Sequence, residues 1–233
     1  MSTLLFVFLL WISMVMLRRI HPQNPLSDEP TVERNEFQAL KREGYQKQYR
    51  IYEDLQKLSG YNRFLANVRV KLGNGQMTTI DLILISKKGI YVFQHIELHG
   101  MIYGDERYKK WTAVERDRTK HAFPNPIWHG KQEILALKPI ILLYEPILYK
   151  SMIVFSEYSH FSRMESTRKG VHICRKQELL LHIREEMLGA KDVLSKEKID
   201  TIYEQLKPYM HKTRKHSNVK PIKPFTLIKG KKE

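Results

Sequence analysis

Cysteine is almost absent from this sequence, and the short motifs that identify many enzymes are missing. Cys174 is the one cysteine among 233 residues, so neither an internal disulfide nor a cysteine-based zinc cluster can form. A single thiol fits a reducing compartment without proving it. The sequence has no glycine-rich phosphate loop, CxxC pair, HExxH or GxSxG motif and no internal repeat. These absences exclude the common signatures of phosphate-loop, zinc-protease and serine-hydrolase chemistry.

Acidic residues are also scarce relative to basic ones. There are 25 Asp and Glu against 40 Lys and Arg, which gives a formal net charge of +15. A protein with this net positive charge attracts polyanions, either nucleic acid or the anionic face of a membrane. Basic residues on the surface can also serve solubility alone. Hydrophobic residues make up 42% of the chain, which is typical of a globular protein. The length predicts one sizeable domain with appendages.

Charge is absent from residues 1–17, and Arg18 and Arg19 follow at once. As a helix this run approaches the roughly 30 Å thickness of the hydrocarbon layer. A cleaved signal peptide would carry its positive charge before the apolar run, and a buried core helix would show a polar face. We therefore predict a single-pass anchor at 1–17 in the cell membrane, with the rest of the chain in the cytoplasm. Residues 18–34 are rich in proline and turn formers, which indicates a linker.

The body of the chain alternates between helical and strand patterns, and it divides into a domain at 35–175 and C-terminal helices at 176–210. Strands are indicated by β-branched and aromatic runs, and the later helix by Asn125–Pro126 at its start. Pro139 should kink or split that helix. In chain order we first predict one weakened helix, or two helices interrupted at Gly44, over 35–58. Strands at 64–72, 78–86 and 90–96 and a hairpin at 100–111 follow. A helix from 125 to about 144, strands at 150–155 and 171–174, and helices at 176–188 and 195–209 complete the order. This order predicts an α/β sandwich with a mixed central sheet.

Residues 211–233 have eight basic side chains and one acidic side chain. This composition predicts a disordered basic tail. The tail would bind the phosphates of DNA or RNA, rest on anionic lipid beside the anchor, contact a protein partner, or simply remain solvated. The basic residues are Lys212, Arg214, Lys215, Lys220, Lys223, Lys229, Lys231 and Lys232.

Asp81 is a carboxylate inside an otherwise apolar strand, between Ile80 and Leu82. Burying a charge there is costly unless another group pairs with it. Taken alone, Asp81 is adequately explained as a strand-end acid that faces solvent or a nearby lysine.

The surrounding segments point to a more specific explanation. They are Thr79-Ile80-Asp81, Gly89-Ile90-Tyr91-Val92-Phe93, Gly100-Met101-Ile102-Tyr103-Gly104 with Trp111, and Asn125-Pro126-Ile127. In this order they resemble the nuclease-related domain (NERD) family over roughly residues 41–156, about half the chain. The resemblance implies the PD-(D/E)xK restriction-endonuclease-like fold, whose core is a helix, three strands, a helix and a strand.

The chemistry of that fold needs two acids, on the second and third strands, that hold a divalent metal such as Mg²⁺. A lysine two residues after the second acid faces the same way and stabilises developing negative charge. The resemblance also implies an acid on the first helix and a glutamine on the helix after Asn125–Pro126.

Four of these five positions depart from the family pattern. Asp81 matches the first acid, but the second acid falls on Gln94 and the lysine on Ile96. The first-helix acid falls on Gln48, and the helical glutamine falls on His129. Losing one preorganised electrostatic group commonly costs about a hundred- to a thousandfold in rate. We therefore expect a catalytically degenerate module, a pseudoenzyme without a cofactor, that binds nucleic acid or a protein partner.

An active metal-dependent nuclease that uses Mg²⁺ in a rearranged site is the alternative. Glu97 could substitute for the second acid only if a bulge turned it round. Glu43 and Glu53 each lie five residues from Gln48, which is a poor helical match. A zinc site from His95, His99 and His129 is disfavoured, since four residues along a strand span about 13 Å.

Overall fold

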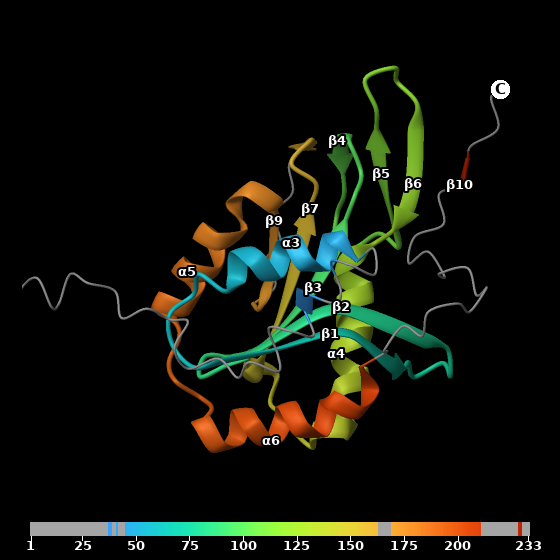
Figure 1. Cartoon of the computed structure of the whole chain (residues 1–233). Helices are drawn as coiled ribbons and strands as arrows, with labels where there is room; N and C mark the ends of the chain where they lie inside the picture. Colours follow the sequence, from blue (N-terminus) through green and yellow to red (C-terminus); the bar gives the residue numbers. More distant parts are fainter. Residues whose placement is uncertain (1–36, 39–40, 42–44, 163–168, 211–227, 230–233) are drawn as a thin grey trace, which may run out of the picture.

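The computed structural model describes residues 37–38, 41, 45–162, 169–210 and 228–229. They form a mixed α/β structure with two five-stranded sheets (Figure 1). The predicted anchor at 1–17 and linker at 18–34 lie outside the described residues, as does most of the predicted tail at 211–233. Within the described part of the chain, no helix is long and apolar enough to cross a membrane.

The central sheet has the strand order β1-β2-β3-β7-β9. Pairing is antiparallel from β1 to β3 and parallel from β3 through β7 to β9. The sheet is therefore mixed, as the sequence predicted. Its strands are β1 (Asn62–Lys71), β2 (Met77–Ser86), β3 (Gly89–Ile96), β7 (Tyr149–Phe155) and β9 (Val171–Arg175).

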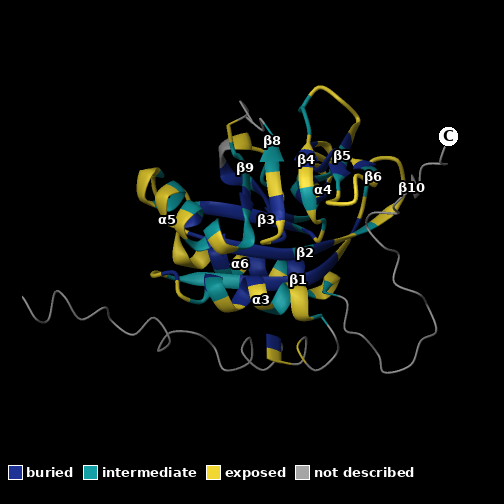
Figure 2. Cartoon of the chain, turned by 90° about the horizontal axis from the view of Figure 1, so that it is seen from above, coloured by how far each residue is buried: buried dark blue, intermediate teal, exposed yellow. Residues whose placement is uncertain are grey.

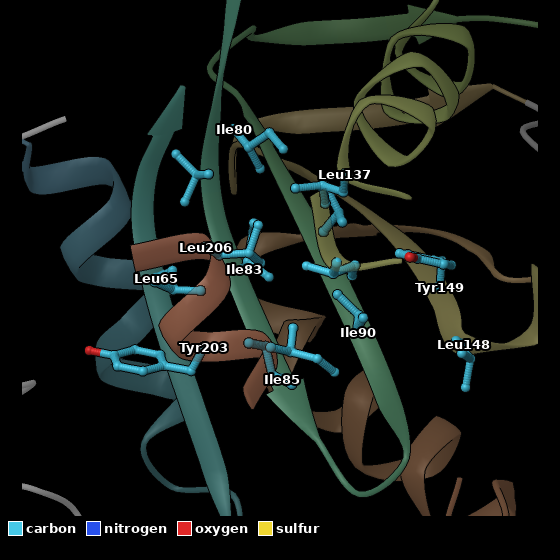
Figure 3. Close-up of a cluster of buried hydrophobic side chains, with 14 of the residues drawn as sticks. Leu65, Ile80, Ile83, Ile85, Ile90, Leu137, Leu148, Tyr149, Tyr203 and Leu206 are labelled. Atoms are coloured by element: carbon cyan, nitrogen blue, oxygen red, sulfur yellow. The ribbon is translucent and has the colours of Figure 1, made fainter. Parts of the chain in front are cut away.

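Helices cover both faces of this sheet (Figures 1 and 2), because most of its strands are apolar on both sides. One face packs against α4 and α6 in an apolar cluster that includes Ile83, Leu137 and Leu206 (Figure 3). The other packs against α3 and α5 in a second cluster that includes Leu84 and Ile183. The helices are α3 (Gln46–Leu55), α4 (Pro126–Ile141), α5 (Leu179–Gly189) and α6 (Lys196–Leu206), with short 3-10 helices η2 (Pro146–Leu148), η3 (Lys176–Glu178) and η4 (Lys207–Tyr209).

The second sheet has the order β10-β6-β5-β4-β8 and stands at one end of the molecule (Figure 1). The predicted hairpin is its β4–β5 pair. A third apolar cluster, which includes Ile96, Trp111 and Phe155, joins the two sheets. The strands are β4 (Gly100–Tyr103), β5 (Lys110–Val114), β6 (Lys120–Pro124), β8 (Ser159–Ser162) and β10 (Ile228–Lys229).

Helix α4 begins where the sequence predicted. The side chain of Asn125 accepts a hydrogen bond from the backbone N–H of Ile127, and Pro126 occupies the first helical position. Of the two outcomes predicted for Pro139, a kink or a split, the split does not occur, because the helix is continuous to Ile141. Pro139 lies in the last turn, so only two residues follow it before the left-handed Leu142 ends the helix.

Candidate functional site

Asp81 lies where the side chains of the neighbouring strands β1 and β2 stop alternating regularly between the two faces of the sheet. Ala66 and Leu82 pair with one another and contact the second apolar cluster, on the α3 side. Two residues further along, Val68 and Ile80 pair and contact the first cluster, on the α4 side. In a regular strand, residues two apart face the same way. Both strands therefore change faces at the position that Asp81 occupies on β2.

Asn67 stands opposite Asp81 on β1 at this break. Its backbone is left-handed, with φ at 53°, and its side chain is 4% exposed. A left-handed non-glycine residue is uncommon and costs conformational energy. The break is thus built into the sheet, and it allows Asp81 to interact with groups from both layers of helices.

Strands β2 and β3 separate at the same place. Their pairing runs from the Lys87–Lys88 turn as far as Leu82 and Phe93, whereas β3 continues beside β7 to Ile96. The backbone N–H of His95 donates a hydrogen bond to Oδ2 of Asp81 at 3.0 Å. Asp81 on β2 thus accepts a hydrogen bond from β3 at the point where the two strands no longer pair.

The other carboxylate oxygen is bound from α3. Nε2 of Gln48 donates to Oδ1 of Asp81 at 3.2 Å, so the structure brings Gln48 to Asp81. Burial raises the pKa of Asp81, while the hydrogen bonds from His95 and Gln48 and the charge of Lys47 oppose that rise. Both oxygens of Asp81 are therefore engaged by N–H donors of the protein.

Gln94 is held by the first turn of α4. Its Nε2 donates to the backbone oxygen of Pro126 at 3.1 Å. Its Oε1 lies 3.2 Å from Nδ1 of His129, and because an amide oxygen only accepts, that ring nitrogen is the donor. A Cβ atom on Gly130 would lie 2.4 Å from Nε2 of Gln94 and 2.5 Å from Oγ of Ser151. Glycine at this position lets the helix approach the strand closely enough for these bonds.

Ile96 contributes no polar group to the site. Its side chain is 1% exposed and belongs to the apolar cluster between the two sheets, with Trp111, Phe155 and Ile127. A charged lysine at this position would have to enter that cluster, at a considerable desolvation cost.

Glu133 is a second carboxyl group that sequence reasoning missed. It lies one turn after His129 on α4, is 1% exposed, and places Oε1 3.4 Å from Nδ1 of His129. Burial, together with the nearby charge of Asp81, raises its pKa well above the usual range, which favours the protonated form of Glu133. Burial lowers the pKa of His129, so both groups of this contact are shifted toward their neutral forms. The spacing of four residues from His129 on a predicted helix was the signal available in the sequence.

The other candidate groups point elsewhere. Glu97 forms an ion pair with Lys47 at the surface, His99 packs edge-on against Tyr158, and Glu53 is exposed. Burial lowers the pKa of His95 to about 4. Within the described residues, no three His, Cys, Asp or Glu side chains are grouped closely enough to hold a metal ion. Glu43 lies outside the described residues.

This donor set does not fit a Mg²⁺ ion of the kind that restriction-endonuclease-like enzymes use. Mg²⁺ prefers ionised carboxylates in near-octahedral geometry. Here Asp81 already accepts two protein hydrogen bonds, the pKa of Glu133 is raised by burial, and Gln94 is neutral.

The rim of the site carries charges of both signs. Lys47, Arg50 and Lys176 lower the pKa of His95 and Glu97 raises it. Lys47 is paired with Glu97, and Lys176 is paired with Asp54. Of the basic tail, the structure describes Lys229, whose backbone pairs with His121 of β6. The other seven basic residues predicted for binding lie outside the described part of the chain.

The chain is similar to one known family and to a bacterial protein. Residues 43–156 match the family model of the nuclease-related domain, and this range includes Gln48, Asp81, Gln94, Ile96, His129 and Glu133. An uncharacterized protein of Bacillus anthracis is 31% identical over 109 residues, which are 47% of this chain and 50% of that protein. The chain thus spans about half the length of this curated relative. No solved structure matches the chain.

Proposed function

Because residues 43–156 belong to the nuclease-related domain family, we propose that the chain is a nuclease-fold module that binds nucleic acid without cutting it by the usual metal-dependent route. The proposal includes the finer fold assignment. The order α3, β1 to β3, α4 and β7 supports a restriction-endonuclease-like core. We further propose that residues 1–17 anchor the module in the cell membrane with its body in the cytoplasm.

The observation that carries the proposal is the packing of the two replaced positions on β3. The amide of Gln94 bonds to the first turn of α4, and Ile96 fills an apolar cluster. A carboxylate at position 94 would face the backbone oxygen of Pro126 without a hydrogen to donate, and a lysine at position 96 would place its charge in apolar surroundings. The electrostatic stabilisation of a reacting phosphate is therefore missing on the strand that would supply it.

Binding of nucleic acid is supported by charge. The chain carries a net charge of +15, and Lys47, Arg50 and Lys176 lie near the site. Basic side chains that neutralise phosphates release counterions, which supplies a large part of the affinity of proteins for nucleic acid.

Glu133 favours a second candidate function, an active nuclease with a rearranged site. Its carboxyl group stands close enough to Asp81 for the two to interact electrostatically. If Glu133 lost its proton, two carboxylates would face the site, from β2 and α4. This arrangement would restore the number of acids without restoring their usual places.

One experiment separates the two candidates. Full-length protein in detergent is incubated with labelled single-stranded DNA, duplex DNA and RNA, in the presence of Mg²⁺ or Mn²⁺. We expect salt-dependent binding, no cleavage, and the same outcome for Asp81→Ala. Metal-dependent cleavage that is lost in both Asp81→Ala and Glu133→Gln would instead establish the rearranged enzyme. Absence of binding to all three nucleic acids would overturn the nucleic-acid role and leave a protein partner as the remaining explanation.

A further inference from the structure

A loop beside the site, residues 105–109, is unusually well held for a surface connection. Nδ2 of Asn125 donates to the backbone oxygens of Asp105 and Glu106, each at 3.3 Å, and of Tyr108 at 2.7 Å. The backbone N–H of Asn125 also donates to the oxygen of Lys109 at 2.9 Å. The side chain and the backbone N–H of Asn125 therefore bind the carbonyl groups of every loop residue except Arg107.

Two tryptophans add to this support. Nε1 of Trp111 donates to the oxygen of Asp105 at 2.9 Å, and Nε1 of Trp128 donates to that of Glu106 at 2.8 Å. A Cβ atom on Gly104 would lie 2.2 Å from the ring of Trp111. The loop and the buried indole therefore fit closely, and the loop is held in one conformation.

The hydrogen bonds that hold the loop point inward, while its largest side chains point outward. Tyr108 is 63% exposed, and the guanidinium of Arg107 lies 6.0 Å from its ring centre. Lys109 and Lys110, which follow directly, are exposed. Tyr108 thus offers most of its ring to solvent from a loop whose backbone is fixed by hydrogen bonds.

The solvent-facing side of α4 continues this surface. Trp128 is 39% exposed, and Lys131 is exposed three residues later on the same side of the helix. Because the indole N–H of Trp128 is bound to Glu106, the group that it offers to solvent is its ring. His129, in the same helical turn, contacts Gln94 of the site. The exposed rings and the Asp81 site are therefore attached to the same turn of α4.

We propose that Tyr108 and Trp128, flanked by Lys109, Lys110 and Lys131, form a binding surface for single-stranded nucleic acid. Unpaired bases stack on the two rings, and the lysines contact the phosphates that connect them. A duplex keeps its bases stacked on one another, so the rings would have no base face to contact. This inference rests on the proposed nucleic-acid function and names the strand class and the residues that serve it.

The test measures the anisotropy of a labelled mixed-sequence DNA strand with the full-length chain, alone and annealed to its complement. We expect the single strand to bind more tightly than the duplex. Tyr108→Ala should weaken binding about fivefold or more, since stacking contributes that much per base in other proteins. Tyr108→Phe should restore binding because it keeps the ring. Lys109→Ala should reduce the salt dependence of binding by roughly one phosphate contact.

Tyr144→Ala is the matched control, because Tyr144 is 58% exposed and follows the opposite end of α4. It should bind like the unchanged chain. The thermal unfolding midpoint of Tyr108→Ala should equal that of Tyr144→Ala, which excludes misfolding as the cause. If the unchanged chain binds the single strand, and Tyr108→Ala and Tyr144→Ala bind it as tightly as the unchanged chain does, the proposed surface is wrong. The nucleic-acid function would survive that result. A preference for duplex also overturns the surface. If the unchanged chain binds neither form, both proposals fail together.

Discussion

The Asp81 site and the 105–109 loop meet at the first turn of α4, and they use their hydrogen bonds in opposite ways. At the site, polar side chains bond to one another: Gln48 to Asp81, and Gln94 to His129. In the loop, Asn125 and Trp128 bond to the backbone, and Asp105 pairs with Arg107, so the ring of Tyr108 remains exposed to solvent. A fold built in this way can lose the groups that cut nucleic acid and keep the groups that bind it, because the two sets share a helix but no side chain.

The largest effect should come from breaking the support of the loop with Gly104→Ala. The added Cβ would lie 2.2 Å from the ring of Trp111, which is 2% exposed and packs among Phe123 and Phe155. Neither the ring nor the backbone can move away cheaply. We expect the free energy of unfolding to fall by about 3 kcal/mol, as overpacking of a core can produce, measured by urea denaturation.

Gly73→Ala provides the control for that change. A Cβ atom on Gly73 would meet nothing within 4 Å, so its effect should stay within about 0.5 kcal/mol. Equal stability of the two alanine variants would show that the loop is not held by the fit around Trp111.

A smaller effect of opposite sign is expected at the site from Glu133→Gln. Burial raises the pKa of Glu133 in the folded chain, so the folded state keeps a proton that the unfolded state releases above about pH 4.5. The stability of the unchanged chain therefore falls as pH rises from there toward the raised pKa. Glutamine has no such proton to lose.

The variant should be more stable than the unchanged chain near pH 8, and this difference should shrink as the pH falls toward 4.5. In thermal unfolding each kcal/mol corresponds to about 2–4 °C for a chain of this size. Glu53→Gln, which changes an exposed carboxyl on α3, should show no such trend. A difference that is constant with pH would mean that Glu133 is ionised in the folded state.

Much of the fold could be predicted because its main strands are strongly apolar. The runs that became β2, β3 and β7 have β-branched and aromatic residues on both faces, which few structures other than buried strands explain. Strands β6 and β8 were missed for the converse reason. KHAFP and SHFS are short and polar, and they are strands because β5 and β4 offer them hydrogen-bonding partners.

The site could be predicted in part. Residues assigned from the family pattern, Gln48 and His129, do lie beside Asp81 and Gln94 respectively. Glu133 was missed because family positions were compared one by one, and a carboxyl that enters from α4 has no place in that pattern. The change of faces at Asn67 and Asp81 also escaped, since a period of two was assumed along each strand. Only the paired packing of both strands reveals it.

The smallest effect should separate two neighbours on α3, Gln48 and Lys47. Gln48→Ala removes the donor to Oδ1 of Asp81 and should cost about 1 kcal/mol, since a partly buried carboxylate loses a partner. Lys47→Ala breaks an ion pair with Glu97 in which both side chains are about half exposed, and it should cost less than about 0.5 kcal/mol because solvent screens such pairs. Urea denaturation of the two variants measures the difference. If Lys47→Ala were the more damaging change, the charged rim would hold the site together rather than the bonds inside it, and the contrast with the loop would be lost.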